Sequence, residues 1–258
     1  MYSGKVDRAT FDAGLLQRPG PFLQGLVKSG ELAGLFPEVY AMVGFGGSGT
    51  QHKDLWWHTK LVVSQCPANV RVRWAALFHD VGKVQTFEFK TGRVTFHGHE
   101  ALSGKLFRDA AKRTGWFNRE ERVHIRGLIH NLGHIESYEL DWTDSAVRRL
   151  HKLAGDRFED LVALASADIT TKHEDKRSRH HKRMADLVHR AKALAALDAT
   201  PAALPTGLGD ILMAELGLGP SKELGAVMGR LKAAVEAGDL PRSAEPEVYL
   251  AWLRKSAT

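Results

Sequence analysis

Apolar and polar residues recur with the period of a helix over most of the chain. Residues 9–41 predict two short helices, because apolar side chains lie at one-turn spacing from Phe22 to Val27 and again from Leu32 to Tyr40. Alternation of period two occurs only around Thr91 and Gly92, which predicts a small hairpin or an extended loop. The pattern therefore predicts an all-α fold.

Further apolar periodicity and punctuation divide the chain. Helices are predicted around residues 55–63, 74–80, 101–114, 120–131, 145–154 and 158–167, followed by a basic segment at 172–190. Residues 191–203 are then rich in alanine, and Pro201 and Pro205 mark a linker. We expect an N-terminal helical segment over residues 1–50, a main domain over 51–190 and a small C-terminal helical subdomain over 204–258.

One apolar segment runs straight into a polar pair. The residues from Trp74 to Phe78 are followed by His79 and Asp80, and Gly82 then favours the end of the helix. Polar groups at the end of a buried helix need partners, because an unpaired buried charge is very costly. A divalent metal is one such partner, since imidazole and carboxylate are its ligands. A helix-end aspartate beside a satisfied histidine is the alternative interpretation.

Three more residues stand where they can join this pair. His58 lies on a predicted helix, where a histidine alone is usually a core residue. His99 follows the predicted hairpin at the start of the next helix, and Asp168 emerges from the apolar helix 158–167. A buried aspartate in that position demands compensation, as Asp80 does.

A second pair of histidines lies on the helix predicted over 120–131. His124 and His130 are six residues apart and therefore lie on different faces, so at most one faces the cleft. We choose His130 because it sits beside Leu128 and Ile129, and we expect His124 to be exposed.

Composition narrows the class of partner. The chain has 258 residues, a formal net charge of +6 and a pI near 9.4, which favours anionic partners such as nucleotides or nucleic acid. The basic segment holds Lys176, Arg177 and Arg179, and it is either a solvated helix face or a set of phosphate contacts. The glycine-rich stretch Gly44–Gly49 lacks the ending of a P-loop, and we interpret it as a connector.

The setting is predicted from cysteine usage and hydropathy. Cys66 is the single cysteine, so no internal disulfide can form, which indicates a reducing, cytoplasmic environment. We interpret Cys66 itself as a packing residue. The N-terminus has no apolar signal segment, and no apolar run approaches the roughly 20 residues that span a bilayer. We therefore expect no membrane partner.

The order of the candidate residues resembles the HD-domain superfamily, whose pattern is a histidine, a His-Asp dyad and a distant aspartate. The candidate ligands are His58, His79, Asp80, His99, His130 and Asp168. The resemblance implies that His58, His79, Asp80 and Asp168 hold one metal, and that His99 and His130 hold a second. The ions would be one or two divalent transition metals (Fe, Mn, Ni, Co or Zn), and residues 51–190 would form an HD helical bundle. The chain departs from the pattern at Asn131, where the family often has another histidine.

A closer resemblance is to the HD region of bacterial tRNA nucleotidyltransferases, the CCA-adding enzymes. It rests on Phe78–Lys83 and Gly98–Ser103, with Leu32–Glu38 before them and Leu204–Met213 in the tail. The nucleotidyltransferase head of those enzymes is not seen, so we expect a freestanding module that does not add CCA. In the multifunctional relatives such a module implies metal-dependent 2′,3′-cyclic phosphodiesterase, 2′-nucleotidase and phosphatase activity.

The leading hypothesis is a metal-dependent phosphohydrolase acting on 2′,3′-cyclic phosphates or on phosphomonoesters of nucleotides or RNA 3′ ends. Two divalent ions can clamp a phosphoryl group and lower the pKa of a water. Asp80 and Lys83 would be catalytic, and Lys83 with Lys176, Arg177 and Arg179 would bind phosphate. The alternatives are an HD-type di-iron oxygenase and a non-catalytic RNA-binding module, and a dNTP triphosphohydrolase remains a variant of the first class.

Overall fold

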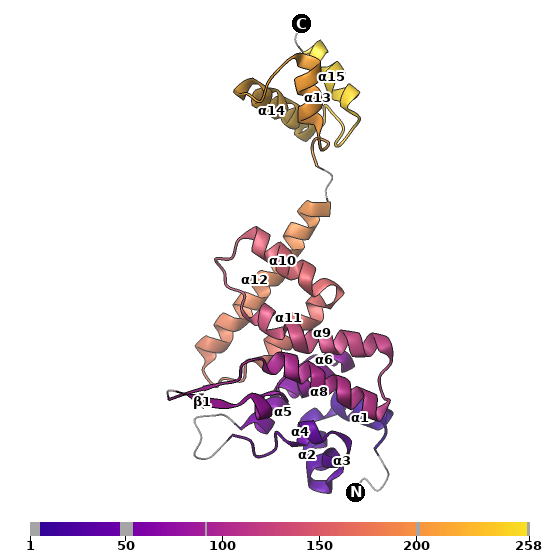
Figure 1. Ribbon diagram of the computed structural model, residues 1–258, viewed down its shortest axis with the longest axis vertical. Helices are drawn as coiled ribbons and strands as arrows, with labels where there is room; N and C mark the ends of the chain where they lie inside the picture. Colours follow the sequence, from indigo (N-terminus) through magenta and orange to yellow (C-terminus); the bar gives the residue numbers. More distant parts are fainter. Residues whose placement is uncertain (1–5, 47–53, 91, 200–201, 257–258) are drawn as a thin grey trace. The chain divides into compact units, whose positions relative to one another are not determined.

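The structure, a computed structural model, describes residues 6–46, 54–90, 92–199 and 202–256, and it confirms the all-α class. The elements are α1 (Arg8–Gln17), α2 (Pro19–Ser29), α3 (Glu31–Leu35), α4 (Pro37–Tyr40), α5 (Leu55–Gln65), α6 (Val70–Phe78), α7 (Lys83–Thr86), β1 (Glu88–Lys90), β2 (Arg93–Thr95), α8 (His99–Thr114), α9 (Arg119–Glu136), α10 (Asp144–Ala154), the 3-10 turn η1 (Gly155–Arg157), α11 (Phe158–Asp168), α12 (Glu174–Ala199), α13 (Leu208–Leu216), α14 (Lys222–Ala237) and α15 (Pro246–Lys255) (Figure 1). None of the helices in the described ranges is long and apolar enough to cross a membrane.

The predicted hairpin is the one sheet within the described ranges. β1 and β2 pair antiparallel, with Phe89 opposite Val94. The hairpin lies between α7 and α8, so it joins the segment after Asp80 to the helix that begins at His99.

Close contacts divide the chain into two units, Met1–Lys192 and Ala193–Thr258. In the first unit α1 packs on α6 and α2 packs on α5. The N-terminal helices therefore share a core with the helices that follow them. The division between the units falls within α12.

Aromatic rings tie the N-terminal helices to α6. Phe11 stacks on Trp74 with ring centroids 4.6 Å apart, and Phe36 meets both Trp74 and Phe78 edge-on. Aromatic pairs in these geometries add stability beyond the area that they bury. The fully apolar segment that led to the His-Asp pair is thus the centre of the core.

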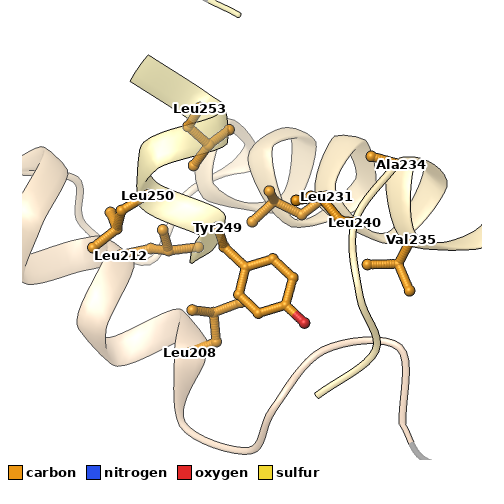
Figure 2. Packing of buried hydrophobic residues seen from close by; sticks show 9 residues of the cluster. All are labelled: Leu208, Leu212, Leu231, Ala234, Val235, Leu240, Tyr249, Leu250 and Leu253. Carbon is orange, nitrogen blue, oxygen red and sulfur yellow. The ribbon is translucent and has the colours of Figure 1, made fainter. Parts of the chain in front are cut away.

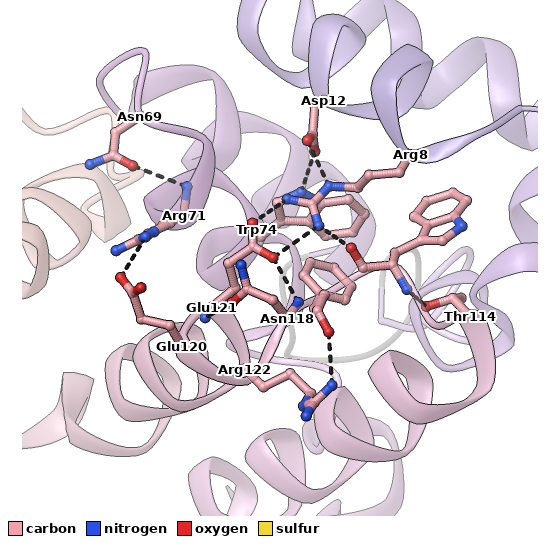
Figure 3. A network of polar contacts seen from close by, with 12 residues as sticks. Arg8, Asp12, Asn69, Arg71, Trp74, Thr114, Asn118, Glu120, Glu121 and Arg122 are labelled. Atoms are coloured by element: carbon pink, nitrogen blue, oxygen red, sulfur yellow. Dashed lines mark hydrogen bonds and ion pairs between the residues drawn. The ribbon is translucent and has the colours of Figure 1, made fainter.

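A polar network covers one edge of this core (Figure 3). Arg8 donates from Nη2 to Glu121 Oε1 at 2.8 Å and from Nε to Asp12 Oδ2 at 2.6 Å. Asp12 also accepts from Trp74 Nε1 at 2.6 Å. The network links α1 to α6 and to the start of α9, where Asn118 and Glu121 form a capping box.

Side-chain caps set where two helices of the site begin. Asp54 accepts from the backbone N–H of Trp57 at 2.8 Å at the start of α5. Asn69 accepts from the N–H groups of Arg71 and Val72 at the start of α6. α6 then contacts α5, α8, α9 and α11, and every residue from Val72 to Phe78 is buried.

The second unit has its own small core (Figure 2). The buried side chains come from α13, α14, α15 and the turn before α15; they are Leu208, Leu212, Leu231, Ala234, Val235, Leu240, Tyr249, Leu250 and Leu253. Tyr249 is fully buried, and its hydroxyl donates to Pro241 O at 2.7 Å and accepts from Ala244 N at 2.9 Å. The helices predicted for the tail therefore pack into a helical subdomain.

Candidate metal centre

Two helix ends and one helix interior bring four of the predicted ligands together. His58 is the fourth residue of α5, His79 and Asp80 form the turn after α6, and Asp168 is the last residue of α11. The Nε2 atoms of His58 and His79 lie 3.0 and 3.2 Å from Asp168 Oδ1, and 3.4 and 3.3 Å from Asp80 Oδ2. Ligand atoms of His58, His79 and Asp168 all lie within 4.8 Å of one another, so these residues could hold one ion.

The other ring nitrogen of each histidine is held by an oxygen. His79 Nδ1 lies 2.7 Å from Ala76 O, and His99 Nδ1 lies 2.9 Å from Phe96 O. A carbonyl only accepts, so each Nδ1 must carry the proton. Thr170 Oγ1 lies 3.0 Å from His58 Nδ1 and can accept the same bond. These partners turn all three Nε2 atoms toward the carboxylates.

This arrangement fits a bound cation. A neutral Nε2 presents a lone pair, and a lone pair facing a carboxylate oxygen at about 3 Å is repelled unless a proton or a metal lies between them. The buried atoms His79 Nε2 and Asp168 Oδ1 make no hydrogen bond within the described ranges, although they are 3.2 Å apart. Two imidazoles and two carboxylates suit a divalent transition metal, which would satisfy both atoms.

The charges of the cluster reinforce one another. Burial opposes protonation of His79, but Asp80 and Asp168 outweigh it and raise its pKa well above the ordinary value. Burial likewise opposes ionisation of Asp80, yet His79 and Lys83 hold its pKa well below the usual range. The pKa of Asp168 is also well below its usual range, because His79 and His58 outweigh burial. The site therefore keeps both carboxylates ionised and favours positive charge between them.

Lys83 extends the cluster on one side. Its Nζ donates to Asp80 Oδ2 at 2.8 Å and lies 5.6 Å from the centre of the Phe96 ring. The pKa of Lys83 is raised, because the charge of Asp80 outweighs the effect of burial. The ammonium group is thus fixed beside the candidate ligands.

A small cavity of about 100 Å³ adjoins the cluster. Its lining consists of His79, Asp80, Lys83, His99, Glu100, Ile129, Leu132, Gly133, Glu136 and Asp168. His99 Nε2 lies 3.6 Å from Asp80 Oδ1 across this space. Burial and the neighbouring Asp168 raise the pKa of Glu136 to about 9. Glu136 was not among the predicted site residues.

The placement of the α9 histidines differs from the prediction. His130 is exposed and does not line the cavity, so the expected pair of His99 and His130 is not brought together. His124, expected to be exposed, is half-buried, and its Nε2 lies 2.7 Å from Asp160 Oδ2. Nearness in sequence to Leu128 and Ile129 does not place a residue on their face, because each step along a helix turns the side chain by about 100°. Asn131 donates to Gly127 O within the helix.

The helix itself is longer than predicted. The sequence indicated an end near Asn131, but α9 continues through Gly133 to Glu136. A Cβ at Gly133 would lie 3.1 Å from Glu100 Oε1, so the glycine here makes room for α8 and does not end the helix. Ile129, Leu132, Gly133 and Glu136 then share one face, and that periodicity was the signal that could have identified Glu136.

The basic segment lies apart from both cavities that border the cluster. Lys176 and Arg179 are exposed, and Arg177 forms an ion pair with Glu174 in the same turn of α12. None of the three lines either cavity. The role of these three residues as phosphate contacts stays a prediction.

A larger cavity of about 440 Å³ opens on the other side of the cluster. It is lined by Phe45, Leu55, His58, Asp80, Lys83, Phe96, Asp168, Ile169, Thr170 and Thr171. Phe45 belongs to the glycine-rich stretch that we interpreted as a connector, and the part of that stretch beyond Gly46 lies outside the described residues. Cys66 is buried away from this lining, and burial raises the pKa of its thiol to about 12, as suits a packing residue.

Replacing Gly82 by alanine is expected to destabilise the fold by about 1–3 kcal/mol, the usual cost of overpacking. The new Cβ would lie 2.4 Å from His99 O and 2.9 Å from Ser103 Oγ, so α8 would have to move away from the turn that carries Asp80. Denaturant unfolding measures the change. Gly34→Ala is the matched control, because a Cβ at Gly34 meets nothing within 4 Å. Equal stability of the two variants would contradict the prediction.

Comparison with known proteins supports a relation to enzymes of tRNA. The chain is 29% identical over 222 residues to the A-adding tRNA nucleotidyltransferase of Deinococcus radiodurans, covering 83% of this chain and 50% of that protein. It is 28% identical over 263 residues to the CC-adding tRNA nucleotidyltransferase of Thermus thermophilus, covering 96% of this chain and 54% of that protein. The Multifunctional CCA protein of Pseudomonas paraeruginosa is 30% identical to the chain over 202 residues, and the match covers 72% of this chain and 47% of that protein.

The chain matches only part of each of these relatives. No model of a known protein family matches it. The chain spans about half the length of the curated relatives that it matches. It is therefore related to the tRNA nucleotidyltransferases over most of its own length, and it carries a His/Asp cluster that could bind a metal.

Proposed function

We propose that this chain is an HD-type, metal-dependent phosphohydrolase that acts on 2′,3′-cyclic phosphates or on phosphomonoesters of nucleotides or RNA 3′ ends. The observation that carries the proposal is the convergence of His58, His79 and Asp168, with Asp80 beside them, while the buried atoms His79 Nε2 and Asp168 Oδ1 lack hydrogen bonds within the described ranges. These four side chains would hold the ion. Such an ion acts as a Lewis acid toward a phosphoryl oxygen and makes a water more acidic.

The residues around the ligands have separate tasks. Lys83 would balance the negative charge of the phosphoryl group, since Lys83 lines the larger cavity and its ammonium is held in place by Asp80. Thr170 would orient His58, and the carbonyls of Ala76 and Phe96 would orient His79 and His99.

The class of substrate is proposed from the relatives and from charge. The relatives bear names that refer to the addition of A or CC to tRNA or to a multifunctional CCA protein, which favours a role in tRNA processing. A net charge of +6 favours a polyanionic substrate. Within that role, an RNA end or a nucleotide presents the phosphoryl group that the site would bind.

The test is hydrolysis by metal-loaded protein. Wild type, loaded in turn with Mn²⁺, Co²⁺, Ni²⁺, Zn²⁺ and Fe²⁺, is incubated with adenosine 2′,3′-cyclic phosphate, with an RNA ending in a cyclic phosphate and with nucleoside monophosphates. We expect ring opening or release of phosphate by wild type and by His130→Ala, and none by Asp80→Ala. Hydrolysis by Asp80→Ala at the wild-type rate, or no hydrolysis by wild type with any of the metals, would contradict the proposal.

Replacing Thr170 by valine is expected to weaken metal binding by about 10- to 100-fold, the usual effect of removing a group that orients a ligand. Valine keeps the shape of the side chain but removes the oxygen 3.0 Å from His58 Nδ1. Calorimetric titration with Mn²⁺ or Zn²⁺ gives the Kd. Thr114→Val serves as the control, because that hydroxyl bonds to Ala110 O within α8. A Kd equal to that of the control would show that Thr170 does not orient His58.

A further inference from the structure

The lining of the larger cavity contains two chemically different groups of side chains. The first is the polar cluster, with His58, Asp80, Lys83 and Asp168. The second is apolar and aromatic, with Phe45, Phe96, Leu55 and Ile169, and Phe96 adjoins the polar group through Lys83. A volume of about 440 Å³ lies in the range of cavities that hold small organic ligands, roughly 300–1,000 Å³. The cavity thus suits one small molecule that is anionic at one end and flat or apolar at the other.

Phe96 is held by the residues of the cluster itself. It directly follows β2, and its carbonyl accepts from His99 Nδ1 at 2.9 Å. Its ring centre lies 5.6 Å from Lys83 Nζ and 6.0 Å from the ring centre of Phe87, at an interplanar angle of 56°. The position of this ring is therefore tied to the candidate ligands on one side and to the hairpin segment on the other.

Phe45 is held by contacts with the start of α5 and with Phe87. Its carbonyl accepts from Leu55 N at 3.0 Å, at the first residue of the helix that carries His58. Its ring meets Phe87 edge-on, with centroids 5.9 Å apart and an interplanar angle of 85°. Phe87 thus contacts both rings that line the cavity. Such fixed aromatic rings stack well on a planar base, because little conformational freedom remains to be lost on binding.

We propose that Phe45 and Phe96 form a base-stacking subsite, so that the cavity takes a single nucleotide unit. Its phosphoryl group would lie against the polar cluster and its base against the two rings. This inference rests on the proposed function for the position of the phosphate and adds the base as the group recognised. Stacking on phenylalanine is tolerant of base identity, since every base has a π-face. The subsite would therefore favour nucleosides in general over base-free phosphates.

The variants that test the subsite are Phe96→Leu and Phe45→Leu. Leucine keeps an apolar side chain at each position but removes the ring. Phe89→Leu is the matched control, because Phe89 lies on the same hairpin, is 60% exposed and does not line the cavity. Thermal melting of all three variants checks that each is folded.

Binding is measured first, on metal-free protein so that nothing is hydrolysed, with adenosine 3′-monophosphate and ribose 5-phosphate as probes. We expect wild type and Phe89→Leu to bind the nucleotide more tightly than the base-free sugar phosphate. Phe96→Leu and Phe45→Leu should lose about 5- to 150-fold in nucleotide affinity, the range for loss of one base–aromatic stack. Their affinity for ribose 5-phosphate should not change. Equal affinity of wild type for the two probes, or variants that match the Phe89→Leu control, would overturn the subsite.

Kinetics with metal-loaded protein separate this inference from the proposed function. Adenosine 2′,3′-cyclic phosphate is compared with ribose 2,3-cyclic phosphate, which lacks the base. Equal kcat/KM for the two would reject the subsite and leave the hydrolase proposal standing. No turnover of either, together with the expected loss of nucleotide binding in Phe96→Leu and Phe45→Leu, would reject the hydrolase proposal and leave the subsite standing.

Discussion

Replacing Asp168 by alanine is expected to weaken metal binding more than about 100-fold and to abolish hydrolysis. Even residues that only orient a ligand cost about 10- to 100-fold when removed, and Asp168 would bind the ion itself. Its Oδ1 is the atom that lies 3.0 Å from His58 Nε2 and 3.2 Å from His79 Nε2. Without it the two imidazoles face Asp80 alone, and the ion loses half of its carboxylate charge.

Thermal stability offers a readout of this change that does not depend on turnover. At a metal concentration 100 times the wild-type Kd, binding stabilises the folded state by about 2.7 kcal/mol. If the Kd of the variant is 100 times higher, metal at the same concentration stabilises its folded state by only about 0.4 kcal/mol. The comparison is made between metal-free and metal-loaded samples of each variant, so that any effect of the substitution on the metal-free fold cancels.

His130→Ala is the control for this experiment. It removes an imidazole from the same unit, but His130 is exposed and lies outside the cavity. We expect it to keep the wild-type increment and the wild-type activity. An Asp168→Ala protein that binds metal as wild type does would remove Asp168 from the ligand set. A loss of metal in His130→Ala would reinstate His130 as a ligand.

Replacing Arg73 by methionine is expected to destabilise the protein by about 3 kcal/mol or more. Arg73 is only 7% exposed, and its guanidinium donates to four backbone carbonyls. Leu15 and Leu16 belong to the last turn of α1, and Cys66 and Pro67 follow α5. The positive charge of the guanidinium near the C-termini of two helices also interacts favourably with the negative ends of both helix dipoles.

The expected loss of stability follows from the backbone carbonyls that would lose their hydrogen-bond donor. A buried carbonyl without a donor costs roughly 1–3 kcal/mol, and more than one would lose its donor here. Methionine fills part of the volume but donates nothing. A loss of about 3 kcal/mol corresponds to a fall in Tm of about 6–12 °C for a chain of this size.

Arg71→Met is the matched control on the same helix. The Arg71 side chain is 36% exposed and pairs with Glu120, whose side chain is 74% exposed, so its loss should cost no more than about 1 kcal/mol. Denaturant unfolding of both variants gives the two values. Similar losses for Arg71→Met and Arg73→Met would mean that capping by Arg73 contributes little to stability.

The parts of the fold that the sequence predicted well are those set by local spacing. The helix through Trp74 ends next to His79 and Asp80, the hairpin closes around Gly92, and the helix after Phe158 ends at Asp168. Each of these follows from the side chains within one or two turns and from glycine or a polar residue at the break. The resemblance of their order to the HD-domain pattern then nominated six residues, of which His58, His79, Asp80 and Asp168 lie close together.

Where the prediction from local spacing was wrong, the cause was contact between segments that are distant in the sequence. The predicted end of this helix near Asn131 is wrong, because Glu100 of α8 lies against Gly133 and α9 continues to Glu136. Because it continues, Glu136 reaches the cavity. His130 points instead to solvent, since the face of α9 that packs on α6, α8 and α11 carries Ile129 and Leu132.

The amino-acid pattern was therefore sufficient to predict the all-α class and the order of the helices, and its resemblance to the HD-domain pattern added the candidate ligands. Packing between helices determines which face of α9 meets the cluster, which oxygen orients each imidazole and which aromatic rings line the cavity beside it. The difference arises from the range over which the interactions act. Periodicity and capping act within a few residues, whereas the orientation of a helix is set by the side chains of neighbours that lie 33 to 112 residues away in the sequence.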